Sequence, residues 1–258
     1  MAWHRAHGGG VTLIRTEIDA SDPAAASGWM AVVDDELYGD AALSAPNTSL
    51  AHLRSLADDR LRAATHRAGR PTALTLVDRD GTVIVDRHYL ADPDGVELLP
   101  GAAEGLRLLK QTGVKVALVT NQSGVARGLI SRDTLEHIHT RLTDLLAAQG
   151  VALDGIYVCP HGSEEGCACR KPRIGLAQQA AAELGLPLRD ATVVGDKPAD
   201  IGLARALGVP ATLVTTGEGG ATLTSGSDHP DYVVDDLSAM ARLHTHPAGL
   251  LHPVALPG

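Results

Sequence analysis

The sequence contains no phenylalanine, and aromatic residues make up only 2% of its 258 residues. A hydrophobic core must therefore be built from Ala, Val, Leu and Ile, which dominate the 44% of residues that are hydrophobic. No apolar run approaches the ~20 residues that span a bilayer, and the N-terminus lacks the apolar stretch of a signal peptide. We therefore expect a cytoplasmic protein without a membrane partner.

Positive charge is also scarce, since the formal net charge is −9. This balance disfavours a protein that binds nucleic acid by neutralising phosphates. It leaves room for a phosphorylated small molecule, because a bound cation and a few Lys and Arg side chains can reverse the field at one site. Cysteine is limited to Cys159, Cys167 and Cys169, an odd and clustered set that favours a metal site over disulfides.

Predicted strands and helices alternate from residue 71 onward. Apolar runs predict strands at 73–77, 114–119, 155–158, 192–194, 211–214 and 232–234. Helical patterns lie at 102–111, after Ser131, and at 175–184, 199–207 and 237–243. This alternation predicts an α/β domain over residues 71–243, a Rossmann-like parallel sheet with helices on both faces.

The two ends of the chain carry less information. Residues 1–70 form an N-terminal extension of unknown role, in which residues 11–18 favour a strand and residues 47–49 are typical of the cap of a helix that ends near residue 69. The tail at 244–258 is rich in His and Pro, and we expect it to be flexible.

Two carboxylates, Asp78 and Asp80, follow the first strand of the α/β domain, and Gly81 then lets the chain turn away. Ligands of open parallel sheets bind beyond the carboxyl ends of the strands, so both acids are expected to point into a site. A solvated turn is the alternative for this pair alone. Three later segments add a hydroxyl at Thr120, a cation at Lys171 and an acid at Asp196.

The cysteines belong to a short ligand-rich segment. Cys159, His161, Cys167 and Cys169 are spaced as Cys-x-His-x₅-Cys-x-Cys, which supplies the four ligands of a closed, structural zinc site. The alternative is three free thiols beside an incidental histidine. A catalytic zinc is disfavoured, because four protein ligands leave no open position. The segment runs directly into Arg170 and Lys171, so zinc would also fix where these cations point.

Together these motifs resemble the haloacid dehalogenase-like phosphatases. The zinc loop followed by Arg-Lys-Pro is shared by the D-glycero-D-manno-heptose-1,7-bisphosphate phosphatases and the histidinol-phosphate phosphatases. Residues 78–82, 120–128 and 154–157 resemble the heptose enzymes, whereas the short loop between His161 and Cys167 is nearer to the histidinol enzymes. Residues 173–176 and Ile84 also depart from the heptose pattern. The resemblance covers about residues 72–243.

The resemblance implies roles for the motif residues. Asp78 is expected to be the nucleophile of an aspartyl-phosphate mechanism and Asp80 the general acid and base. Thr120 and Lys171 are expected to hold the transferring phosphoryl group. Mg²⁺ is assigned to Asp78, the Asp80 backbone and Asp196, with Asp200 in support, because crowded carboxylates need a cation.

A small phosphorylated sugar is the expected partner, and the protein is expected to be a monomer or weak homo-oligomer. The segment between Asp80 and Pro100 is too short for a large cap domain. Arg170 suits a second phosphate, since a guanidinium can bind phosphate with two hydrogen bonds. The other residues expected at the substrate site are Arg79, Asp86, Tyr89, Asn121, Gln122, Ser123, Arg127 and Lys197.

Three alternatives to a heptose bisphosphate phosphatase stay open. The nearest is a histidinol-phosphate phosphatase. A scaffold protein that kept the fold and lost turnover is a second, although intact Asp78, Asp80, Lys171 and Asp196 speak against it. A polynucleotide 3′-phosphatase is a third, and the acidic balance disfavours it.

Overall fold

The computed structural model describes residues 2–8, 11–17, 28–33, 36–39, 72–225 and 230–245. The chain divides into two compact units, one of residues 70–245 and one of residues 1–69 with 246–258. Among the described residues, no helix is both long and apolar enough to cross a membrane. The predicted helix between residues 47 and 69 and nearly all of the predicted tail lie outside the described residues.

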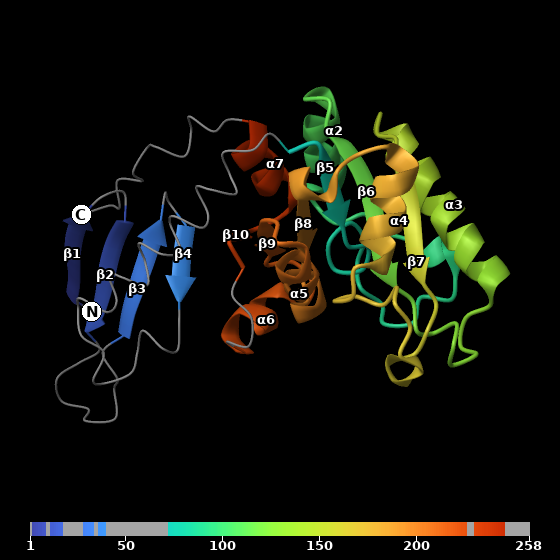
Figure 1. The fold of residues 1–258 in the computed structure, drawn as a ribbon, viewed down its shortest axis with the longest axis horizontal. Coiled ribbons are helices and arrows are strands. Elements are labelled where there is room, and N and C mark those ends of the chain that lie inside the picture. Colours follow the sequence, from blue (N-terminus) through green and yellow to red (C-terminus); the bar gives the residue numbers. More distant parts are fainter. Residues whose placement is uncertain are drawn as a thin grey trace. The chain divides into compact units, whose positions relative to one another are not determined.

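An antiparallel sheet is the described part of the N-terminal unit (Figure 1). Its strands follow one another in the order β1-β2-β3-β4. They are β1 (Ala2–Gly8), β2 (Val11–Glu17), β3 (Gly28–Val33) and β4 (Glu36–Gly39). Strand β2 matches the strand predicted at 11–18, whereas the other three were not predicted.

The second unit contains a six-stranded sheet in the order β10-β9-β8-β5-β6-β7. All of its strand pairs are parallel, as the sequence predicts. The strands are β5 (Leu74–Val77), β6 (Lys115–Asn121), β7 (Gly155–Cys159), β8 (Ala191–Gly195), β9 (Ala211–Val214) and β10 (Tyr232–Val234). The first strand of this unit, β5, therefore lies in the interior of the sheet.

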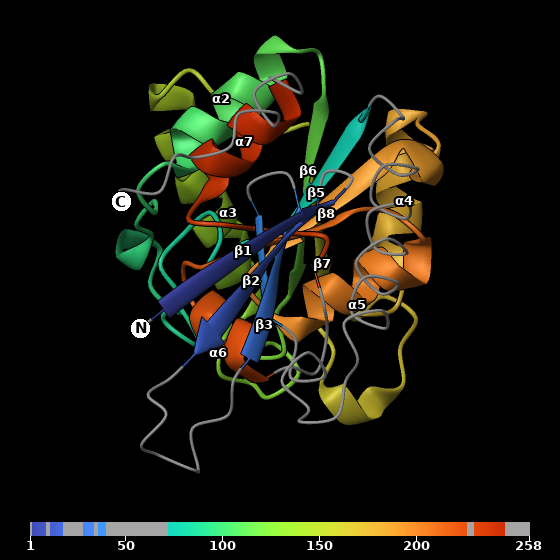
Figure 2. The ribbon, with the colours of Figure 1, turned by 90° about the vertical axis from the view of Figure 1, so that its left-hand side faces the viewer.

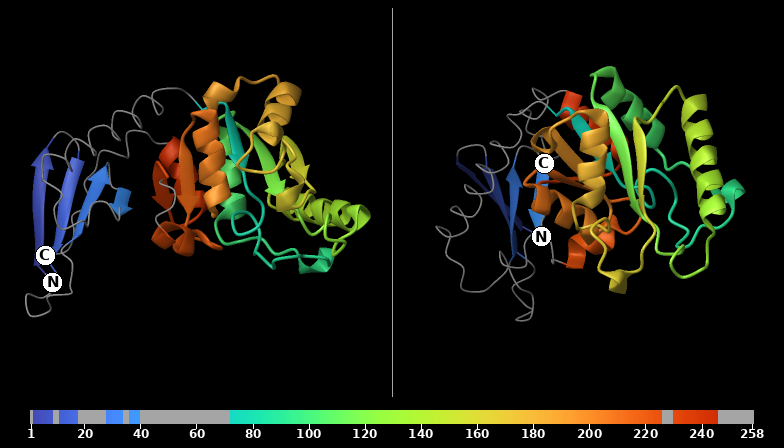
Figure 3. Two further views of the ribbon diagram at one scale, coloured as in Figure 1. Left: turned by 60° about the horizontal axis from the view of Figure 1, so that its bottom comes forward. Right: turned by 45° about the vertical axis from the view of Figure 1, so that its right-hand side comes forward.

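Helices cover both faces of this sheet (Figures 1 and 3). The α-helices are α2 (Ala102–Gln111), α3 (Arg132–Ala148), α4 (Gly175–Leu184), α5 (Pro198–Leu207), α6 (Gly219–Ser225) and α7 (Leu237–Thr245), and short 3₁₀ turns are η2 (Pro93–Gly95), η3 (Ser163–Glu165) and η4 (Leu188–Asp190). Helices α2, α3 and α7 pack on one face and α4 and α5 on the other. Figure 2 shows α2 and α7 side by side.

Aliphatic side chains fill both layers, as the scarcity of aromatic residues predicts. Side chains alternate along each strand, so Leu74 and Leu76 face α4 and α5, whereas Val77 faces the layer of α2, α3 and α7. Helix α3 begins after Ser131, whose hydroxyl accepts a hydrogen bond from the Thr134 backbone N–H at 2.9 Å. This core holds the carboxyl ends of the strands at one edge.

Candidate active site

Asp78 lies at the centre of that edge. Strand β5 pairs with β6 on one side and β8 on the other, with Val77 opposite Leu118 and Val194. The Asp78 backbone N–H extends the ladder by donating to the Val194 carbonyl at 3.0 Å. Asp78 therefore follows β5 between the ends of its two neighbours, where Thr120 and Asp196 lie.

A buried cation joins two of the acids. The ammonium of Lys171 donates to Asp78 Oδ1 at 2.7 Å and to Asp200 Oδ1 at 2.6 Å, and its side chain is only 3% exposed. Burial alone would lower the pKa of Lys171, but the charges of Asp200 and Asp78 raise the pKa overall. Lys171 is therefore charged and fixed beside the predicted nucleophile.

Asp196 has one oxygen that no protein group satisfies. Its Oδ2 accepts a hydrogen bond from the Glu218 backbone N–H at 2.8 Å, whereas Oδ1 is buried without a hydrogen-bond partner. Burial and the nearby charge of Asp78 raise its pKa to about 7. Oxygens of Asp78, Asp196 and Asp200 lie within 4.8 Å of one another. This oxygen-rich, under-neutralised cluster fits a hard divalent cation such as Mg²⁺.

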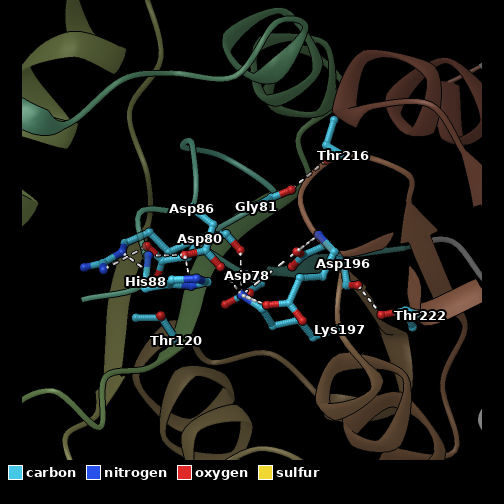
Figure 4. A network of polar contacts seen from close by, with 12 residues as sticks. Asp78, Asp80, Gly81, Asp86, His88, Thr120, Asp196, Lys197, Thr216 and Thr222 are labelled. Carbon is cyan, nitrogen blue, oxygen red and sulfur yellow. Dashed lines mark hydrogen bonds and ion pairs between the residues drawn. The ribbon is translucent and has the colours of Figure 1, made fainter. Parts of the chain in front are cut away.

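Residues that follow β9 form hydrogen bonds with Gly81 and Asp196, and these contacts were not predicted from the sequence. The Thr216 hydroxyl donates to the Gly81 carbonyl at 2.6 Å, and the Thr222 hydroxyl donates to the Asp196 carbonyl at 2.8 Å (Figure 4). A Gly- and Thr-rich segment is typical of any surface loop, so the sequence offered no signal for this role.

Asp80 is held by residues that were predicted to contact substrate. Arg79 is completely buried and binds both oxygens of Asp80 through Nε and Nη2, at 3.1 and 3.0 Å. Gln122 donates to Asp80 Oδ2 and to the Thr120 hydroxyl, both at 2.7 Å. Arg79 and Gln122 thus both contact Asp80, and Gln122 also contacts Thr120, the hydroxyl predicted to be catalytic. The third contact of Arg79 is with His139, which the sequence did not single out.

Asn121 contacts the backbone of Lys171. Its side-chain amide donates to the Lys171 carbonyl at 3.1 Å, and its side-chain oxygen accepts from the Lys171 N–H at 3.0 Å. The end of β6 therefore fixes the chain at Lys171. This contact places Asn121 beside the site while its amide is engaged with protein.

Asp86 and Lys197 form a polar pair next to Asp80 (Figure 4). Lys197 Nζ donates to Asp86 Oδ2 at 2.7 Å and to the Asp80 carbonyl at 3.4 Å. Burial opposes the charge of Lys197, but Asp196 and Asp78 raise its pKa overall. Burial likewise opposes the charge of Asp86, and Lys197 lowers its pKa overall. The backbone N–H of His88, a residue with φ of 60°, also donates to Asp86.

The remaining predicted substrate residues lie on loops around these acids. The Arg127 guanidinium carbon lies 5.5 Å from the centre of the Tyr89 ring, and the backbone N–H of Arg127 donates to the backbone carbonyl of the half-buried Ser123 at 3.1 Å. Arg170 donates to the His161 carbonyl at 3.3 Å. Arg127 and Arg170 thus lie on two separate loops, which follow β6 and β7.

The predicted zinc ligands converge. The Cys159 sulfur lies 3.6 Å from both the Cys167 sulfur and His161 Nδ1, and His161 Nδ1 lies 3.1 Å from the Cys169 sulfur. These separations exceed a disulfide bond and approach the ~3.7 Å edge of a tetrahedron around zinc. Burial raises the pKa of Cys159 to about 12, so its thiolate needs a neighbouring cation. The four side chains fit a structural zinc ion.

Comparisons with known proteins find relatives of the domain that contains this site. Residues 168–240 match the HAD-hydrolase-like family, and residues 74–202 match the polynucleotide kinase 3 phosphatase family. A D-glycero-beta-D-manno-heptose-1,7-bisphosphate 7-phosphatase of Pseudomonas putida is 39% identical over 170 residues, which cover 66% of this chain and 97% of the relative. A D-glycero-D-manno-heptose-1,7-bisphosphate 7-phosphatase of Thermosynechococcus vestitus is 38% identical over 183 residues, 66% of this chain and 93% of the relative.

A solved structure extends the comparison to three dimensions. The D,D-heptose 1,7-bisphosphate phosphatase of B. bronchiseptica, complexed with magnesium and phosphate, superposes with a TM-score of 0.62 and 39% identity over 66% of this chain and 96% of that chain. The chain therefore belongs to the D-glycero-D-manno-heptose-1,7-bisphosphate 7-phosphatase family of haloacid dehalogenase-like hydrolases.

Proposed function

We propose that the protein hydrolyses the 7-phosphate of D-glycero-D-manno-heptose 1,7-bisphosphate in a Mg²⁺-dependent reaction. The observation that carries the phosphatase chemistry is the contact of buried Lys171 with Asp78, beside the unsatisfied oxygen of Asp196. The choice of sugar follows the relatives, which share 38–39% identity over almost their whole length. The acidic net charge of −9 gives no support to a nucleic-acid substrate.

Asp78 is the proposed nucleophile. A carboxylate oxygen of Asp78 attacks the phosphorus atom while the bond from phosphorus to the sugar oxygen breaks. Asp80 gives its proton to the departing sugar oxygen, which leaves as a hydroxyl group. Asp80 then accepts a proton from water as that water attacks the aspartyl-phosphate, which releases inorganic phosphate and restores Asp78.

Charge on the phosphoryl oxygens has to be offset in both steps. The ammonium of Lys171 and the hydroxyl of Thr120 lie at the same sheet edge as Asp78, and we assign them to these oxygens. Mg²⁺, held by Asp78, the Asp80 carbonyl and Asp196, would supply further electrostatic stabilisation. Asp200 supports this set from the side, because its oxygens accept from Lys171 and from the Lys197 backbone N–H.

The remote end of the substrate is assigned to the surrounding loops. Arg170 is the proposed ligand of the 1-phosphate, since a guanidinium can bind phosphate with two hydrogen bonds. Asp86 and Lys197 offer paired polar groups for sugar hydroxyls. Tyr89 is 40% exposed and, with Arg127, is proposed to line the entrance. Zinc on the Cys/His cluster would fix the loop that leads into Arg170.

The direct test is phosphate release from a panel of substrates. We expect the highest kcat/KM for one anomer of heptose 1,7-bisphosphate, above histidinol phosphate and fructose 1,6-bisphosphate, and loss of turnover on addition of EDTA. Asp78→Asn should fold normally and lower kcat by about 10³-fold or more, because the amide is a poor nucleophile. Preference for histidinol phosphate would contradict the sugar assignment, and turnover by Asp78→Asn would contradict the mechanism.

A further inference from the structure

A completely buried guanidinium connects the proposed acid to a helix that lies outside the catalytic motifs. Arg79 is the middle residue of the Asp-x-Asp motif, and its side chain is 0% exposed. One edge of its guanidinium group, Nε and Nη2, binds the two oxygens of Asp80 at 3.1 and 3.0 Å. The remaining nitrogen, Nη1, lies 3.1 Å from Nε2 of His139 on α3.

The chemistry of this contact fixes the state of the imidazole. An arginine side chain only donates hydrogen bonds, so His139 Nε2 must accept, and the proton of the neutral ring must lie on Nδ1. Burial and the charge of Arg79 lower the pKa of His139 to about 4. His139 is therefore a neutral hydrogen-bond acceptor for a buried cation.

This acceptor restricts how Arg79 can hold Asp80. A guanidinium group is planar, so a contact at Nη1 together with the fork at Nε and Nη2 fixes the orientation of the whole group. Without the acceptor, the buried N–H on Nη1 would have lost this hydrogen bond. The guanidinium would then be more stable if it turned towards water or another acceptor. Asp80 would then keep only Gln122, at 2.7 Å, among these side-chain donors.

We propose that His139 is a positioning residue that orients the acid and base Asp80 through Arg79. The inference rests on the proposed function, because it assigns proton transfer to Asp80. His139 is expected to touch no substrate atom. It acts by holding the Asp80 carboxyl group at the angle from which its proton reaches the leaving oxygen, a geometry on which general acid catalysis depends.

The dependence of the Asp78 phosphorylation rate on the leaving group distinguishes a positioning role of His139 from a general effect on folding. A sugar alkoxide is a poor leaving group and needs the proton of Asp80 when Asp78 is phosphorylated. p-Nitrophenolate leaves without a proton, so phosphorylation of Asp78 by p-nitrophenyl phosphate does not need the acid. Hydrolysis of the aspartyl-phosphate needs the base whichever substrate formed it.

The experiment compares His139→Leu, which removes the acceptor, with His139→Gln, which offers a carbonyl oxygen near the place of Nε2. His137→Leu is the matched control, because it makes the same change at an exposed position of the same helix. Asp80→Asn is the benchmark for complete loss of the acid. Rapid-quench and stopped-flow measurements give the first phosphorylation step for a sugar phosphate and the nitrophenol burst for p-nitrophenyl phosphate.

We expect His139→Leu to slow phosphorylation by the sugar phosphate about tenfold or more, with the nitrophenol burst within about twofold of wild type. Steady-state turnover of p-nitrophenyl phosphate should fall, KM should change little, and His139→Gln should recover most of the sugar phosphate rate. His137→Leu should behave as wild type, and Asp80→Asn should show the pattern of His139→Leu more strongly.

Equal slowing of both first steps in His139→Leu would overturn the proposal, and so would no slowing of either. A His139→Gln variant that is as impaired as His139→Leu would also overturn the proposal. Any alkyl phosphate that the wild-type protein hydrolyses serves in this comparison. A different preferred sugar would therefore contradict the proposed function and leave the positioning role standing.

Discussion

Asp196 shows how much of this site depends on single backbone positions. Gly81 and Gly217 both have positive φ, at 83° and 56°, and both approach Asp196 closely. A Cβ atom at residue 217 would lie 2.3 Å from Asp196 Oδ2 and 2.5 Å from the Gly81 Cα atom. These glycines let two loops close on the carboxylate, so that Glu218 N–H binds one oxygen and the other is left for the proposed metal.

We therefore expect Gly217→Ala to weaken Mg²⁺ binding about tenfold or more, because the new methyl group displaces Asp196 or its supporting turn. Gly185→Ala is the matched control, since Gly185 has φ of 67° and a Cβ there would meet nothing within 4 Å. Both variants should lose about 1–2 kcal/mol of unfolding free energy from the left-handed backbone. Isothermal titration with Mg²⁺ distinguishes an effect on metal binding from this general loss of stability. Equal Mg²⁺ affinities in the two variants would contradict the prediction that the methyl group at residue 217 displaces Asp196.

The sequence predicted which residue types gather at this edge of the sheet, but not the protein contacts that three of their side chains make. Arg79, Asn121 and Gln122 were expected at the substrate, and the structure directs them to Asp80, the Lys171 backbone and Thr120. No local pattern in the sequence shows whether such a polar side chain contacts protein or substrate. His139 gave no signal, because one histidine beside the buried face of a helix is ordinary.

At the scale of elements, the cysteine loop is the part that most needs a ligand to hold its shape. Residues 163–166 are exposed and contain only the short turn η3, so apolar packing contributes little there. The loop nevertheless leads into Lys171, whose ammonium must stay within hydrogen-bond distance of Asp78. A metal ion on the Cys/His cluster would supply the missing rigidity.

Cys169→Ser is expected to lower the zinc content, the melting temperature and kcat together, with the melting temperature falling about 2–4 °C for each kcal/mol of stability lost. Ala168→Ser, an exposed change in the same loop, is the control and should keep all three. Metal analysis, thermal unfolding and phosphate release below the unfolding transition give the three values. Wild-type protein purified without bound zinc, yet equally stable, would contradict this assignment.

Helices and strands with a strong hydrophobic pattern were predictable, whereas long-range hydrogen bonds between side chain and backbone were not. The strands predicted at 73–77, 114–119 and 192–194 match β5, β6 and β8, and the helix predicted at 102–111 matches α2. Helix α6 was missed, because its Gly- and Thr-rich sequence reads as a loop. Its attachment through the Thr222 hydroxyl to the Asp196 carbonyl is long-range, and no local pattern records it.

At the scale of the molecule, the sheet order accounts for where the chemistry lies. Strand β5 has β6 on one side and β8 on the other. The chain therefore first adds β6 and β7 on one side of β5, and then adds β8, β9 and β10 on the other side. Loops diverge at such a position and open a site at the carboxyl edge. The parallel sheet was predictable from the alternation of elements. The order of its strands was not predicted and comes from the structure.

The unit of residues 70–245 contains every residue assigned to the reaction. We expect a fragment of these residues to fold and to keep kcat/KM within about threefold of the full chain, because compact units with their own core fold alone. The matched comparison is the full chain under the same conditions, with circular dichroism to verify folding. A folded fragment with much lower kcat/KM would assign a catalytic contribution to the N-terminal unit.

The amide of Asn121 imitates a peptide group. It donates to the carbonyl and accepts from the N–H of one residue, Lys171, as a neighbouring strand would. The hydrogen-bonding pattern of the sheet is thereby extended by one side chain, which holds the backbone of Lys171, the lysine proposed to bind the phosphoryl group. Because this contact holds the backbone of Lys171 from the end of β6, a change in the length of residues 162–166 would not by itself displace the lysine.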